Sequence, residues 1–179
     1  MSTVLSSSNS ATFNPSTSQG AGTYTRQAKR GSCNSSFENS SGSWVVTEYS
    51  AFSAGTISST GEAICNGGSP ATISSSADAS GGNGTITYQW KKGTTVLSSS
   101  NSSTYTPTTT GTYTRQAKRG SCNSSFENSS GSFVVSAYAT FSAGAINTTG
   151  ETIGYGGDPA TIGEATAASG GAGTYSYRW

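Results

Sequence analysis

The sequence predicts an all-β protein built of β-sandwich repeats that follow one another end to end, and three observations predict it. Residues 22–46 and 111–135 are the same text except that Trp44 is replaced by Phe133, so the chain repeats with a period of 89 residues. A period of this length is the size of one small sandwich domain. Only 9% of the residues are charged, yet nine Tyr, six Phe and three Trp recur at equivalent positions, which a disordered linker has no reason to do.

The repeat places one complete domain in the middle of the chain. Residues 51–138 are expected to form it, whereas residues 1–50 match its C-terminal half and residues 139–179 its N-terminal half. Neither half closes a core alone, because a sandwich needs both sheets. Two explanations stay open: the chain is a window of a longer repeat array, which we favour because the ends carry no cap, or the C-terminal half of one subunit is completed by the N-terminal half of the next.

The strands of the complete repeat follow from alternation and turn residues. Pro70 opens a strand, where its missing N–H is tolerated. The segment 80–85, SGGNGT, is a turn because glycine and asparagine accept positive φ. The segment 120–131 is expected to be a long loop before the last strand. The expected strands are 54–58, 70–77, 86–92, 94–97, 103–106, 111–119 and 132–138.

Four aromatic residues are the expected core anchors. Ile86, Tyr88 and Trp90 share one face of the third strand, so Trp90 anchors the core and Trp179 repeats it 89 residues later. The two other anchors are the tyrosines that open the penultimate strand and its repeat, Tyr113 and Tyr24. In the same strand Arg115 is expected to be a rim or edge residue, because on an inward face its stem would have to pack and its head would have to reach an edge.

These residues resemble a known family. A G-x-Y motif at Gly111, after a Trp in the third strand, resembles the immunoglobulin-like sandwich. More narrowly, the order ICNGGSPATI, ASGGNGTITYQW, YTRQAKRGSC and FVV is similar to the tandem immunoglobulin-like repeats of giant surface adhesins in Bacteroidetes, including gliding-motility adhesins exported by type IX secretion. The strand that holds Tyr113, Arg115 and Ala117 departs from that family, whose members usually carry more β-branched residues there.

The resemblance implies a structural role outside the cell. The expected function is that of a repeat in an extracellular filament or adhesin stalk on a bacterial cell surface, serving adhesion or gliding motility. The expected partners are neighbouring repeats or copies of the same chain, and then surface glycans. The alternative function is a secreted carbohydrate-binding module that uses exposed aromatic residues such as Tyr24, Tyr49 or Tyr155.

Other chemistry has little support in the sequence. The chain has no His, and its eight Asp and Glu residues are scattered singly, so we expect no enzyme, no catalytic or metal site and no cofactor. A net charge of +1 gives no reason for a nucleic-acid partner, and no apolar run approaches membrane-spanning length. The basic runs 26–30 and 115–119 are expected to be exposed strand residues rather than a polysaccharide site.

The three cysteines are disulfide candidates whose pairing stays open. Cys33 and Cys122 occupy the same position in two repeats, whereas the counterpart of Cys65 is Gly154. In immunoglobulin order, Cys65 and Cys122 lie at opposite poles, about 25 Å apart for an eight-residue strand, which no disulfide spans. Head-to-tail stacking instead brings the Cys65 loop to the last loop of the following domain. A Cys65–Cys122 bridge within one repeat is the alternative, and it requires a different strand order.

Overall fold

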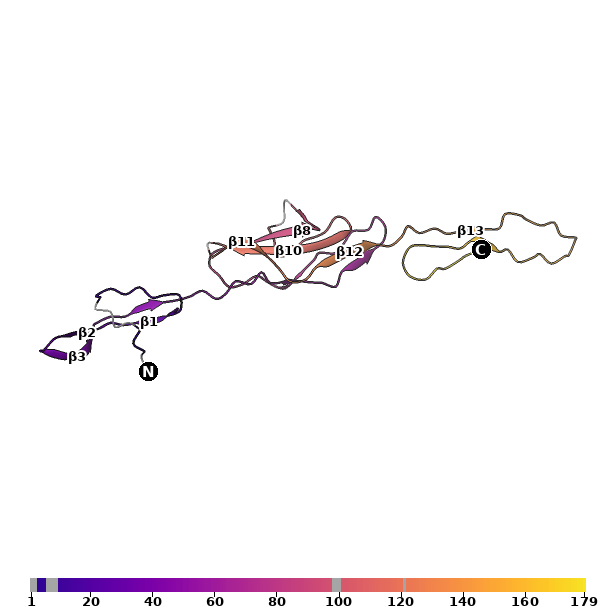
Figure 1. Cartoon of the computed structure of the whole chain (residues 1–179). Coiled ribbons are helices and arrows are strands. Elements are labelled where there is room, and N and C mark those ends of the chain that lie inside the picture. The colour runs from indigo at the N-terminus through magenta and orange to yellow at the C-terminus, as the bar shows by residue number, and fades with distance from the viewer. Residues whose placement is uncertain (1–2, 6–9, 98–100, 121) are drawn as a thin grey trace. The chain divides into compact units, whose positions relative to one another are not determined.

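The structure is a computed structural model, and it describes residues 3–5, 10–97, 101–120 and 122–179. All regular elements among these residues are β-strands, so the fold is all-β (Figure 1). The chain divides into two compact units, Met1–Ser50 and Ala51–Trp179, and each is described by itself.

The main sheet lies in residues 51–138. Its order is β6-β12-β10-β8-β9, with β11 also paired to β10. Central β10 runs antiparallel to β8, β11 and β12, whereas β6 pairs with β12 in parallel. Figure 1 shows β8, β10 and β12 side by side. The strands are β6 (Glu62–Ile64), β8 (Ile86–Lys92), β9 (Thr95–Val96), β10 (Gly111–Arg119), β11 (Asn123–Asn128) and β12 (Phe133–Ala137).

A two-stranded sheet of β5 (Thr56–Ile57) and β7 (Ser75–Ala77) supplies the other side of the core. The core takes three side chains from each half of the repeat, and all six are at most 6% exposed. Tyr105 packs against two of the expected anchors: its ring is stacked with that of Trp90, with centroids 5.6 Å apart, and tilted against that of Tyr113, with centroids 5.7 Å apart. The six residues are Ile57, Ile73 and Trp90 from the first half, and Tyr113, Phe133 and Val135 from the second.

The expected loop 120–131 is wrong over half its length, because β11 forms a hairpin with β10. Apolar alternation does not mark β11. Its pairing is supported by polar and cationic contacts instead, since Gln116 Nε2 donates to Asn128 Oδ1 at 2.8 Å and Lys118 Nζ lies 4.8 Å from the Phe126 ring centroid. Sequence patterns also missed β6, whose three residues are too few to show a period.

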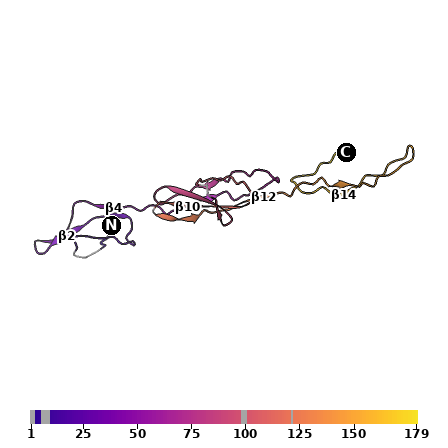
Figure 2. The same ribbon diagram turned by 90° about the horizontal axis from the view of Figure 1, so that it is seen from above.

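Shorter strands form in the flanking segments. In Met1–Ser50, β1 (Gly22–Tyr24) pairs with β4 (Trp44–Val46), and β2 (Gln27–Arg30) pairs with β3 (Asn34–Asn39). In residues 139–179 the named strands are β13 (Ala145–Ile146) and β14 (Glu164–Thr166), which pair with each other. Figure 2 shows β14 as a short arrow in a mostly irregular ribbon.

Candidate interface of the C-terminal half-repeat

The complete repeat has a second core cluster in which β10 fills a space between small residues. Ala54, Ala79 and Ala117 are buried there, and Ala117 comes from β10 with 0% exposure. Partly buried Phe52 and Tyr88 pack against the three alanines, as does Ile86. The cluster therefore needs a strand from the second half of the repeat to close it.

The same strand sends Arg115 into the interior, so the expectation of a rim or edge position is wrong. Arg115 is 0% exposed, because β10 lies in the middle of the sheet rather than at an exposed edge. Its guanidinium donates hydrogen bonds to both hydroxyl and carbonyl oxygens, which is how a buried arginine is tolerated. The acceptors are Ser129 Oγ (3.0 Å), Ser75 Oγ (2.8 Å), Ser103 O (2.9 Å), Ala54 O (3.2 Å) and Ala77 O (3.2 Å).

Two opposing effects act on the charge of Arg115: its burial and its neighbouring groups. Burial lowers the pKa of the guanidinium below its usual value, while Tyr88 and Asp78 act in the opposite direction. The guanidinium carbon also lies 4.9 Å from the centroid of the Tyr88 ring. Arg115 therefore ties both sheets of the repeat together as a buried cation with complete hydrogen bonding.

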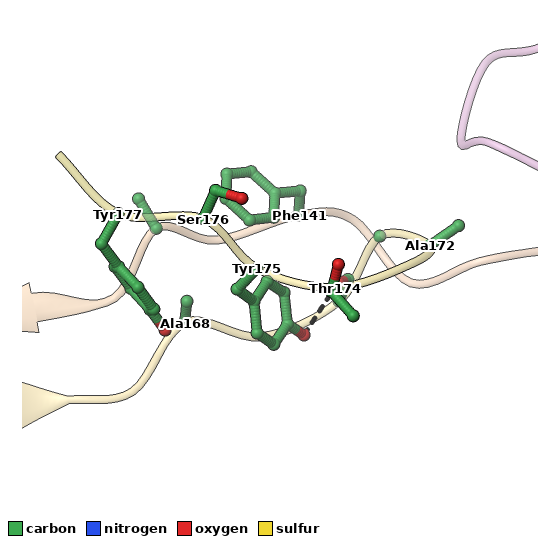
Figure 3. A pocket seen from close by; sticks show the side chains of 10 residues that line it. Phe141, Ala168, Ala172, Thr174, Tyr175, Ser176 and Tyr177 are labelled. Atoms are coloured by element: carbon green, nitrogen blue, oxygen red, sulfur yellow. Dashed lines mark hydrogen bonds between the residues drawn. The ribbon is translucent and has the colours of Figure 1, made fainter.

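In the C-terminal half-repeat, the space that corresponds to the one filled by Ala117 is open. A hollow of about 380 Å³ lies between the segments around Phe141 and Tyr175, whose ring centroids are 6.2 Å apart (Figure 3). Its lining repeats the second cluster at an offset of 89 residues, without a counterpart of Ala117. The lining residues that match cluster members are Phe141, Ala143, Ala168, Tyr175 and Tyr177.

The first cluster is open in the same half-repeat. Ile146 is 49% exposed and Ile162 is 56% exposed, although their counterparts Ile57 and Ile73 are at most 1% exposed. Trp179, an expected core anchor, is 85% exposed instead. The reason is that the second-half residues of the Trp90 cluster, among them Tyr105 and Tyr113, have no equivalent within residues 139–179.

The first unit contains the counterparts of the second half of the complete repeat. Tyr24, the fourth expected anchor, is half-buried, and its hydroxyl donates to Gly20 O at 2.6 Å. Arg26 and Ala28, the counterparts of Arg115 and Ala117, are exposed. Trp44 is 72% exposed, whereas its counterpart Phe133 is 6% exposed. Side chains that close the core in the complete repeat therefore lie on the surface of this unit.

All three cysteines are exposed free thiols. Cys65 follows β6, which runs beside the end of β12 next to Gly111, while Cys122 follows Arg119 at the other end of β10. The two thiols thus lie at opposite ends of a nine-residue strand, and the alternative Cys65–Cys122 bridge is not formed. The strand order agrees with the one on which the inter-domain alternative depends.

Two isolated carboxylates have the same structural role in two repeats. Glu62 accepts a hydrogen bond from the backbone N–H of Ala71, and Glu151 accepts one from Ala160. Across the described part of the chain, no three His, Cys, Asp or Glu residues group into a set that could hold a metal ion. Nor does any helix in that part have the length and apolar character to cross a membrane.

No protein-family model, no curated protein and no solved structure matches the chain. The hollow at Tyr175 and Tyr177 was missed by motif analysis, because each of its residues is ordinary by itself. The signal that finds it is the offset of 89 residues, which shows that its lining belongs to a core cluster.

Proposed function

We propose that the chain is a structural segment of an extracellular surface filament or adhesin stalk, built of immunoglobulin-like sandwich repeats arranged end to end and serving adhesion or gliding motility. The observation that carries the proposal is that residues 51–138 build a core of their own from both halves of the repeat, while the chain joins this repeat at two opposite ends.

The two ends follow from the register of β10. The chain enters at Phe52, which packs against the Ala117 cluster near the end of β10. A Cβ placed on Gly82 would contact both Phe52 and Asn123, so Phe52 also lies near the start of β11. It leaves after β12, where the N–H of Tyr138 donates to Ile64 O beyond the start of β10. Nine strand residues separate these points by about 30 Å. Each repeat therefore adds length, as a stalk requires.

Surface display on the source cells tests this function. An antibody raised against the chain is expected to label intact, unpermeabilised cells, and brief treatment of those cells with an added protease is expected to remove the label. A cytoplasmic protein serves as the control that stays protected. Antigen that is found only after lysis would overturn the proposal. The denatured, reduced mass of the native polypeptide then distinguishes a subunit near 18.0 kDa from a window of a giant repeat protein.

The exposed aromatic residues favour a second candidate, a carbohydrate-binding module. Tyr49 is 62% exposed and Tyr155 is fully exposed, and such rings stack on sugars. Selective binding on a glycan array that is lost in Tyr155→Ser or in Tyr49→Ser would favour this function over the structural one. Tyr113→Phe is the matched control, because that ring is buried.

A further inference from the structure

We propose that the open half-repeat at residues 139–179 is completed by residues 10–46 of a second copy of the chain, so that copies join head to tail. The inference deepens the proposed function by naming the partner of the repeat, and it rests on that function. The complete repeat 51–138 serves as the template for the joint, since the same two halves pack together there within one chain.

Shape is the first argument. The hollow beside Tyr175 and Tyr177 is the second core cluster without its β10 alanine. Ala28 of β2 is the counterpart of that alanine, and it is exposed. With β2 of a second copy placed as β10 is placed in the complete repeat, Ala28 enters the hollow. A small side chain is required there, because in the complete repeat Ala117 packs against two other alanines.

Apolar complementarity is the second argument. The complete core combines three side chains from each half, and each flanking half presents one set of three. Joining the two halves buries both sets together, which is the main driving force for association. The C-terminal set is Ile146, Ile162 and Trp179, and the N-terminal set is Tyr24, Trp44 and Val46.

Charge complementarity is the third argument, and it favours the joint between copies. Arg115 donates to Ser75 Oγ in the complete repeat. The counterpart of Ser75 in the open half is Glu164, an exposed carboxylate, and the counterpart of Arg115 is Arg26. The joint therefore pairs a guanidinium with a carboxylate, which forms a stronger hydrogen bond than a hydroxyl does.

Closure within one chain is disfavoured by the position of the attachment points. The N-terminal unit is joined to residues 51–138 at the Phe52 end of β10, and the open half-repeat is joined at the Gly111 end, about 30 Å away. Only a few residues link each half to that repeat. The N-terminal unit of a second copy is therefore better placed to fill the open half-repeat than the N-terminal unit of the same chain. Because the two joined surfaces differ, the contact propagates into an open fibre.

The experiment is a mass measurement on the full chain by light scattering and sedimentation velocity over a range of concentrations. The wild type is expected to grow beyond 18.0 kDa with rising concentration. Trp44→Asp and Ile162→Asp are each expected to stop growth, because the counterparts Phe133 and Ile73 are buried. Matched controls are Val45→Asp, whose counterpart is 48% exposed, and Thr149→Asp, whose counterpart is also exposed; both are expected to assemble.

Mixing the two blocked variants gives the sharper result. The Trp44→Asp chain keeps an intact C-terminal half, and the Ile162→Asp chain keeps an intact N-terminal half. Neither grows alone, but together they are expected to form one joint and stop at twice the 18.0 kDa mass. A wild type that stays monomeric from about 1 µM to 1 mM, or assembly that all four substitutions leave unchanged, would overturn the proposal.

The paired charge supplies a quantitative test in the same mixture. Glu164→Gln in the Trp44→Asp chain is expected to weaken the heterodimer about tenfold, since a charge-assisted hydrogen bond becomes a neutral one. Asp158→Asn removes one acid at a position whose counterpart, Ser69, is exposed, and it is expected to leave the affinity unchanged. Equal affinities for the two variants would contradict the Arg26–Glu164 contact.

Failure of this inference is distinguishable from failure of the proposed function. Trp90 is 0% exposed within the complete repeat, whereas Trp44 and Trp179 are exposed. In acrylamide quenching of the Trp44→Phe chain, a protected tryptophan in a monomer shows that the repeat is folded and that only the joint is absent. Full quenching of both tryptophans shows instead that residues 51–138 lack the core on which the structural role depends.

Discussion

Residues 51–90 and 140–179 carry related sequences, yet one segment is half of a closed core and the other is open. Ile73 is 0% exposed and Ile162 is 56% exposed, although each stands in the same P-A-T-I motif. The difference lies in what covers them, because β10 and β12 complete the first segment only. Burial in this fold is therefore a property of the paired halves and not of either sequence alone.

The largest difference in stability between a closed and an open half is expected between Arg115→Ala and Arg26→Ala. Removing the buried guanidinium leaves several interior oxygens without donors, so we expect a loss of about 4 kcal/mol in the free energy of unfolding. Arg26 is exposed, and its loss in the monomer is expected to have no measurable effect. Urea denaturation followed by circular dichroism checks both. Equal losses would mean that the two positions have the same surroundings.

The second-largest effect on stability is expected at the two equivalent isoleucines, Ile73 and Ile162. Ile73→Ala leaves a cavity in the first core cluster and is expected to cost about 3 kcal/mol of unfolding free energy. Ile162→Ala is expected to leave monomer unfolding unchanged while it weakens association between copies. The same urea titration, made at a concentration where the chain is monomeric, separates the two. A large loss for Ile162→Ala in the monomer would contradict an open half-repeat.

Sequence patterns predicted the two longest strands with their bounds, located β5, β7, β9 and β12 within wider expected ranges, and missed β6 and β11. The expected strands 86–92 and 111–119 are confirmed with those bounds, because alternation over seven to nine residues fixes both period and length. β6 is too short to show a period, and β11 is held by polar pairs such as Gln116 with Asn128. The buried role of Arg115 was missed because its five acceptors come from segments far apart in the sequence.

A smaller effect comes from two glycines in the complete repeat. Gly55 has φ +74°, and a Cβ there would run into the backbone of Ala77 and Asp78, so Gly55→Ala is expected to cost about 2 kcal/mol. Gly67 has φ +78° with open space around it, so Gly67→Ala is expected to cost about 1 kcal/mol from backbone conformation alone. Thermal unfolding measures the difference, and equal losses would mean that the β5–β7 contact yields readily.

The cysteines provide the smallest effect on stability and the most local test of the joint. Asn66, next to Cys65, donates a hydrogen bond from its Nδ2 to Thr140 Oγ1 at 2.7 Å, which places Cys65 close to where the open half-repeat begins. In the complete repeat the hairpin residue that follows Cys122 lies near Phe52, so in the joint the residue that follows Cys33 lies near Phe141.

Cys65 of one copy and Cys33 of the next are therefore expected to meet, while Cys122 faces the position of Gly154, which has no thiol. Oxidised glutathione, which accepts the two electrons as both thiols lose their protons, is expected to link copies into a ladder on a non-reducing gel. Cys33→Ser and Cys65→Ser should each remove the ladder, and Cys122→Ser should leave it. A ladder that depends on Cys122 instead would place a different pair of ends at the joint and contradict the register taken from the complete repeat.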